Sequence, residues 1–387
     1  MIEILHDLWG GFLTNFTLYN LMVIFLGSMV GTVVGALPGL GPSAGLALMI
    51  PLTFTMESSA GLALLVGVYM GCMFGGRITA ILINTPGDAP AIVTCLDGYP
   101  LMQQGRGGFA LGISAISSFV GGLFGIIVLI FLAPTIASLV INFGAPEYFM
   151  LLLLGLCTIA LLAGDSVVKA LLMTVLGFVI GLVGCDFVSG YTRFCYTPEL
   201  LEGIDFVVVI MGMYGIGEVL HNVEHQVHLN LGKPNFKTSE YIPTAKELKQ
   251  VGMPMLRGSL IGTIIGILPA AGGTIATFLA YATEKKCAKQ PERFGHGAPE
   301  GLASPEAANN ASVGGALIPL ITMGIPGSGG TAIMLGVFIM FGMRPGPLLM
   351  TESGEIVWAM IAALAIANFF LLISNLLMSP LFVNTMR

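Results

Sequence analysis

Apolar segments recur along almost the whole chain, and this pattern constrains the fold more than any other feature. Several, such as 108–133 and 355–382, reach the roughly 20 residues that a helix needs to cross a bilayer. They do not show the alternation of about ten residues that is typical of outer-membrane strands. Only 9% of the 387 residues are charged, which is too few to cover a water-facing surface. The sequence therefore predicts an all-α polytopic membrane protein.

Two of these apolar segments are broken by the same cluster of Gly and Pro, GALPGLGP at 35–42 and GILPAAGG at 266–273. The surrounding stretches, 27–45 and 258–276, match without a gap. Loose packing of small residues would scatter the glycines, whereas here they keep one register together with a Leu-Pro pair. The matching residues are Gly27 and Gly258, Ser28 and Ser259, Gly31 and Gly262, Thr32 and Thr263, Gly35 and Gly266, Leu37 and Leu268, Pro38 and Pro269, and Gly41 and Gly272.

A second pair of stretches follows in the same order. GGRITAILINTPGDAP at 75–90 resembles GGALIPLITMGIPGSGG at 314–330, and one added residue aligns both the Gly-Gly and the Pro-Gly pairs. We therefore predict two inverted repeats, 1–220 and 258–387, joined by a polar cytoplasmic link at 221–257. The second repeat has no partners for the later helices of the first, so the chain is expected to be C-terminally short.

The segment 258–283 has basic residues on both sides, Arg257 before it and Lys285 after it. Because basic loops stay on the cytoplasmic side, the segment is predicted to enter and leave on one side, as a re-entrant hairpin that turns at Pro269–Gly273. Non-helical backbone at that depth requires surrounding protein or a water-filled cavity. A straight single span remains the alternative.

Matched, interrupted apolar segments are typical of the binding sites of secondary transporters. Such breaks free carbonyl groups for a cation and present helix N-termini to an anion. The predicted breaks are at Pro38, Pro86, Pro269 and Pro326. The candidate substrate-binding residues are Ser43, Arg77, Asn84, Thr85, Thr274, Asn310 and Ser328. The candidate cation-binding residues are Gly39, Gly41, Asp88, Gly272, Gly327 and Thr331. The alternative is that the small residues only permit close helix packing.

Charges beside the breaks are expected to be functional, since ionisable groups at membrane depth are costly. Arg77 either receives a substrate carboxylate, pairs with Asp88, or lies at the membrane interface. Asp97 is interpreted as a cap or turn residue, and Glu300 and Glu306 as loop or helix-start residues. Three polar residues are expected to reach the cavity: Asn309, Asn310 and Ser312.

At four motifs the sequence strongly resembles the large permease subunit (TctA) of the tripartite tricarboxylate transporters. These motifs are GALPGLGPSAGLALMIPLTF, GGRITAILINTPGDAPAIVTCLDGYPL, GTIIGILPAAGGTIATFLAYATEKK and GAPEGLASPEAANNASVGGALIPLITMGIPGSGGTAIMLG. Their order and length make the resemblance specific, and it covers nearly the whole chain.

The resemblance implies a multi-pass importer of citrate-like or other carboxylates in the bacterial inner membrane. Transport would be coupled to a cation gradient, with Na⁺ as the expected ion. The implied partners are a small four-helix membrane subunit and a periplasmic solute-binding protein, and the implied movement is of the elevator type. A homo-oligomer is left open, and neither a nucleic acid, an organic cofactor nor a catalytic role is expected.

Two other classes of function are weighed against transport. HNVEH at 221–225 matches an inverted zinc-peptidase motif, in which two His bind Zn²⁺ and Glu is the base. It lies at a helix end without an evident third ligand, so no metal site is predicted. An anion channel normally needs a symmetric filter, which two inverted halves around one central site do not provide.

Overall fold

The computed structural model describes residues 2–144, 166–185, 191–204 and 241–385 apart from 270 and 271, with scattered residues between 146 and 224. The described regular elements are α1 (Ile2–Asn15), α2 (Leu18–Ala36), α3 (Pro42–Thr53), α4 (Ser58–Ile83), α5 (Ile92–Gln103), α6 (Gly107–Val140), α8 (Val167–Gly181), β1 (Gly184–Cys185), β2 (Thr192–Arg193), η1 (Pro198–Glu202), η2 (Met211–Ile216), α11 (Ala245–Ile267), α12 (Gly272–Cys287), η4 (Pro291–Arg293), α13 (Pro299–Met323), α14 (Gly329–Met340), α15 (Leu349–Glu352) and α16 (Gly354–Thr385). The only described strands, β1 and β2, form a two-residue antiparallel ladder. The all-α prediction is confirmed.

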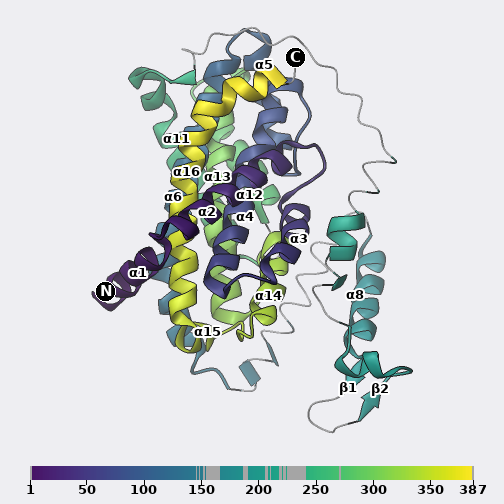
Figure 1. Ribbon diagram of the computed structural model, residues 1–387. Helices are drawn as coiled ribbons and strands as arrows, with labels where there is room; N and C mark the ends of the chain where they lie inside the picture. Colours follow the sequence, from purple (N-terminus) through teal and green to yellow (C-terminus); the bar gives the residue numbers. More distant parts are fainter. Residues whose placement is uncertain are drawn as a thin grey trace.

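The long helices form one bundle, in which α2, α4, α6, α13 and α16 pack against one another (Figure 1). Four described helices are long and apolar enough to cross a membrane: Leu18–Ala36, Ser58–Ile83, Gly107–Val140 and Gly354–Leu377. In α4 nearly every residue is buried, and in α13 every residue from Gly301 to Thr322 is buried. These two helices therefore form the centre of the bundle, and both end in a break.

The two halves repeat the same close helix packing. A Cβ built on Gly31 of α2 would lie 2.3 Å from the carbonyl oxygen of Val68 in α4. A Cβ on Gly262 of α11 would lie 2.2 Å from the carbonyl oxygen of Ala308 in α13. At such distances no side chain other than hydrogen fits, so α2 with α4 and α11 with α13 are equivalent pairs.

This packing corrects one detail of the predicted repeat. A Cβ on Gly75 would lie 2.3 Å from the Thr32 carbonyl oxygen, and one on Gly315 would lie 2.5 Å from the Thr263 carbonyl oxygen. Gly75 therefore corresponds to Gly315. The two central helices match without the added residue that the sequence alignment introduced.

The helices α11 and α12 form a hairpin. Near the open end, the Arg257 guanidinium donates two hydrogen bonds to the Glu284 carboxylate, from Nε at 2.8 Å and from Nη2 at 2.7 Å. The helices are therefore antiparallel, and the chain turns between Ile267 and Gly272, where the Pro/Gly cluster predicted it. Helix α11 begins at Ala245, inside the predicted polar link, because Thr244 and Glu247 form a capping box there.

Each half also packs on the central helix of the other. Helix α6 of the first half contacts α13, and a Cβ on Gly121 would lie 2.0 Å from the Ala307 carbonyl oxygen. Helix α16 of the second half contacts α4. The two halves are thus interlocked, which brings their breaks to one region of the molecule.

Candidate functional site

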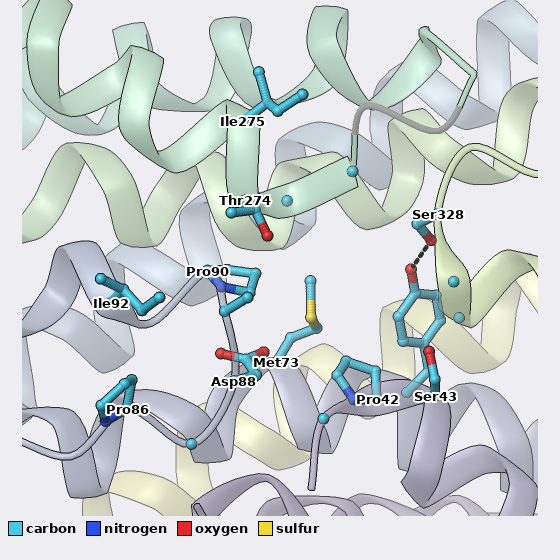
Figure 2. Close-up of a pocket in the computed structure, with 18 of the residues that line it drawn as sticks. Pro42, Ser43, Met73, Pro86, Asp88, Pro90, Ile92, Thr274, Ile275 and Ser328 are labelled. Atoms are coloured by element: carbon cyan, nitrogen blue, oxygen red, sulfur yellow. Dashed lines mark hydrogen bonds between the residues drawn. The ribbon is translucent and has the colours of Figure 1, made fainter. Parts of the chain in front are cut away.

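A pocket of about 580 Å³ lies where the four interrupted segments meet. Figure 2 shows Ser43, Asp88, Thr274 and Ser328 around it, each from a different segment. Its described lining residues are Gly39, Gly41, Pro42, Ser43, Tyr69, Met73, Pro86, Gly87, Asp88, Ala89, Pro90, Ile92, Gly272, Gly273, Thr274, Ile275, Ser328, Gly329 and Gly330. Two hairpin tips and two helix breaks therefore build one cavity.

Both central helices end in the same way. Asn84 follows α4 with φ 54°, and Gly324 follows α13 with φ 72°, so each residue adopts the left-handed conformation that commonly stops a helix. In both cases the next amide donates a hydrogen bond to a carbonyl of the preceding helix. Thr85 donates to the Thr79 carbonyl at 3.3 Å, and Ile325 donates to the Pro319 carbonyl at 3.2 Å. A Pro-Gly pair then leads the chain into the pocket.

After each break a side chain caps the turn that leads into the next helix. Asp88 Oδ1 accepts a hydrogen bond from the amide of Ala91 at 3.1 Å, just before α5. Ser328 Oγ accepts one from the amide of Thr331 at 3.3 Å, at the start of α14. The second Asp88 oxygen, Oδ2, is buried and has no hydrogen-bond partner among the described residues. Its capacity to accept a hydrogen bond or to coordinate a cation is therefore unused by the described residues.

Four helices begin at the pocket, since the first residues of α3, α5, α12 and α14 all line it. A helix N-terminus presents unpaired N–H groups and the positive end of the helix dipole, which favours an anion. Of the described lining residues only Asp88 is charged. The pocket thus combines four weakly positive helix ends with one carboxylate and has no basic side chain among those lining residues.

The structure brings together eight of the predicted site residues and leaves the others outside the lining. Lining the pocket are Ser43, Thr274, Ser328, Gly39, Gly41, Asp88, Gly272 and Pro86. The remainder are Arg77, Asn84, Thr85, Asn310, Gly327, Thr331, Pro38, Pro269 and Pro326. Pro38, Thr85 and Gly327 are next to lining residues in the sequence, and others contact the lining. Thr331, for example, accepts a hydrogen bond from the Ser328 amide at 2.8 Å.

Arg77 is buried between helices and does not line the pocket. Its Nη1 donates to the Leu111 carbonyl at 3.0 Å and to Ser114 Oγ at 2.6 Å, and its Nη2 donates to Asn375 Oδ1 at 2.9 Å. The side chain therefore lies inside the bundle and outside the pocket lining, and none of the described ion pairs joins Arg77 to Asp88. Its hydrogen bonds join α4, α6 and α16 and offset part of the cost of burying its charge, while Nε has no described partner.

Glu306 corrects another expectation, because it is neither a loop nor a helix-start residue. It is buried within α13, where its carboxylate accepts hydrogen bonds from the hydroxyl of Thr94 and, at 2.9 Å, from that of Ser118. Asn310, one turn later, donates to the Glu306 carbonyl at 3.1 Å and does not reach the pocket. Glu300 does lie in the first turn of α13, as predicted.

Asp97 has the predicted capping role, although the loop it caps is distant in sequence. Its Oδ1 accepts hydrogen bonds from the amides of Gly295, Gly297 and Ala298 at 2.9, 2.8 and 2.7 Å. Asn309 and Ser312 lie behind the second hairpin tip, since a Cβ on Gly273 would be 2.7 Å from Asn309 Oδ1 and 3.2 Å from Ser312 Oγ.

Sequence reasoning missed Tyr69, which lines the pocket from the middle of α4. Its hydroxyl shares a hydrogen bond of 2.9 Å with Ser328 Oγ, so a residue of the first half contacts the break of the second. The sequence gives only weak evidence for a role of Tyr69 in the pocket. Tyr69 is a hydroxyl-bearing aromatic residue within an apolar helix, where its O–H needs a partner.

The zinc-peptidase motif at 221–225 lies outside the described residues apart from Glu224. Within the described part of the chain no group of three His, Cys, Asp or Glu side chains could hold a metal ion.

Comparison with known proteins finds one family and two similar proteins from one organism. The model of the tripartite tricarboxylate transporter TctA family matches residues 21–387. An uncharacterized 52.8 kDa protein in the TAR-I ttuC' 3'region of Agrobacterium vitis is 40% identical over 384 residues, covering 99% of this chain and 76% of that protein. An uncharacterized protein in the TAR-II ttuC' 3'region of the same organism is 43% identical over 122 residues, covering 32% of this chain and 50% of that protein. No solved structure matches the chain.

Proposed function

Because the chain belongs to the tripartite tricarboxylate transporter TctA family, we propose that it is the membrane permease subunit of a binding-protein-dependent secondary transporter. Its proposed substrate is a citrate-like tricarboxylate or a related carboxylate, imported together with a cation, for which Na⁺ is the proposed ion. Its proposed location is the bacterial inner membrane. There it works with a small four-helix membrane subunit and a periplasmic solute-binding protein.

The observation that carries this proposal is the charge balance of the pocket. Four helix N-termini favour an anion, yet the charged side chain among the described lining residues is the Asp88 carboxylate. An anionic substrate beside a carboxylate is repelled unless a cation lies between them. A site of this kind binds substrate well only with the cation, and this dependence is the basis of symport.

The two ligands have separate places in this proposal. The cation binds near Asp88 Oδ2 with backbone carbonyls of the first hairpin tip, since a Cβ on Gly41 would lie 3.6 Å from Asp88 Cβ. The substrate carboxylates bind to the hydroxyls of Ser43, Thr274 and Ser328 and to the N-termini of α12 and α14. A volume of about 580 Å³ suits a small polycarboxylate. Elevator-type movement of the hairpins and broken helices then exposes the site to each side in turn.

The test is uptake of radiolabelled citrate into vesicles that contain this chain, the small membrane subunit and the binding protein. We expect accumulation only with an inward Na⁺ gradient and with the binding protein present. Uptake driven by a proton gradient alone would show that H⁺, and not Na⁺, is the coupling ion. Uptake without any cation gradient would contradict symport. Failure across a panel of mono-, di- and tricarboxylates would contradict the substrate class.

A matched variant checks that the pocket itself is the site. Ser328→Leu places a bulky apolar side chain in the lining and should abolish uptake while the protein still inserts into the membrane. The control is Leu348→Ala, because Leu348 is exposed and does not line the pocket. Normal transport by Ser328→Leu would show that the substrate passes elsewhere.

A further inference from the structure

A second pocket, of about 540 Å³, lies at the open end of the α11–α12 hairpin, far along these helices from the tip that enters the first pocket. It is formed by the start of α11, the end of α12, the segment around η4 and the start of α13. Its lining residues are Lys249, Gln250, Met253, Pro254, Arg257, Glu284, Ala288, Lys289, Gln290, Arg293, Phe294 and Glu300. None of them belongs to the transport site proposed above.

Positive charge is in excess in this pocket, with four basic and two acidic lining residues. Arg257 is neutralised by its bidentate pair with Glu284, and Arg293 lies 3.9 Å from the Glu300 carboxylate. Lys249 and Lys289 have no ion-pair partner within the described part of the chain. Two lysines thus offer uncompensated charge to an anion in the same hollow.

An apolar stripe leads from this pocket along α11. Met253, which lines the pocket, is followed by Leu256, Leu260 and Ile264, with exposed fractions between 48% and 57%. Their spacing of three and four residues places them on one face of the helix. In a membrane protein, an exposed apolar face of this kind contacts acyl chains.

We propose that this pocket binds the phosphate of an anionic phospholipid, with Lys249 and Lys289 as the main charged contacts and the acyl chains along the α11 stripe. A basic pocket between helices at the membrane surface suits a lipid headgroup. A free anion would use the lysines but not the stripe, so the continuity of the two features favours a lipid. Bound there, the lipid would hold the base of the hairpin whose tip lines the transport pocket.

The test uses the full chain in detergent, titrated with dioleoylphosphatidylglycerol, and counts retained lipid by native mass spectrometry. The double variant Lys249→Gln/Lys289→Gln should require roughly 25-fold more lipid for equal retention, since each lysine near a headgroup contributes about a factor of five. Lys249→Arg/Lys289→Arg should retain the lipid. The matched control, Lys285→Gln/Lys286→Gln, removes the same charge from the last turn of α12, outside the lining, and should behave as the unmodified chain.

Four results would overturn the proposal. They are equal retention by the double variant and the unmodified chain, an equal loss in the control, equal retention of dioleoylphosphatidylcholine, and displacement of the lipid by an equal concentration of inorganic phosphate. The last would identify a free-anion site. Because the readout is lipid retention and not uptake, it is independent of the proposed transport function.

Discussion

The two helix breaks have the same backbone and different chemistry. Residues 84–88 and 324–328 both start with a left-handed residue, pass through Pro-Gly and end in a side chain that caps the next turn. In the first break the cap is the Asp88 carboxylate, whose second oxygen has no described partner. In the second it is the Ser328 hydroxyl, which also bonds Tyr69. Both repeats therefore contribute the same backbone shape to the pocket, but only the first contributes a charged side chain.

In the proposed function, this difference lets a symmetric scaffold bind two unlike ligands. A carboxylate with a free oxygen favours a cation, whereas a neutral hydroxyl beside a helix N-terminus favours a carboxylate. The following changes test this division between the breaks.

Asp88→Asn should have the largest effect, with cation-coupled uptake reduced by roughly a hundredfold or more, comparable to the loss of an essential charge at a buried site. Asn is also a good capping residue, so the turn before α5 should persist. The measurement is initial uptake rate against Na⁺ concentration. An unchanged Na⁺ dependence would show that the first break is not the cation site.

Ser328→Ala should weaken the other half of the site. It removes the hydroxyl that caps α14 and bonds Tyr69, so we expect a KM roughly tenfold higher and a stability loss of about 1 kcal/mol. Tyr69→Phe removes only the shared hydrogen bond and is the matched comparison. A larger effect from Tyr69→Phe than from Ser328→Ala would identify Tyr69 as the direct ligand.

Gly31→Ala and Gly262→Ala should destabilise the protein to similar extents, by about 1–3 kcal/mol each, because the new methyl group overlaps a backbone carbonyl. The measurement is thermal unfolding in detergent. Gly252→Ala is the control on α11, since a Cβ there meets no atom within 4 Å and should leave the Tm unchanged or higher. A large difference between the first two variants would mean that the halves differ in packing as well as in charge.

Asn84→Gly should have the smallest effect, a change of a few tenths of a kcal/mol at most, because Gly324 already occupies the equivalent left-handed position. Uptake should be unaffected if Asn84 acts only through its backbone. A rise in KM for citrate would instead restore the predicted role of its side chain in substrate binding.

Local sequence predicted the breaks because Pro and Gly act locally. An isolated Pro can remain inside a helix, as Pro134 does in α6 and Pro319 in α13. A Pro grouped with Gly disfavours the helix more strongly, because Gly also adopts the left-handed turn, so Pro38, Pro86, Pro269 and Pro326 indicate the breaks without knowledge of the fold. The residues beside them, including Ser43, Asp88, Thr274 and Ser328, were found for the same reason.

Residues in the middle of α4 and α13 could not be placed in this way. Both helices are buried on every side and have no polar face, so periodicity does not indicate which residue points where. Tyr69 meets Ser328 only because the two halves interlock, and Glu306 meets Thr94 and Ser118 for the same reason. Arg77 likewise donates hydrogen bonds to Ser114 and Asn375 within the bundle, which its nearness to the break in sequence did not reveal.

The ion pair within the second hairpin joins its two helices to each other. Arg257 of α11 is held to Glu284 of α12 by two hydrogen bonds, and α11 ends at Ile267, beside the tip that contributes Gly272 and Thr274 to the pocket. At 1.5 Å per residue, the pair lies about 15 Å from that end of α11. A movement of one helix of the hairpin is therefore expected to carry the other helix with it, so that the tip changes position as a unit.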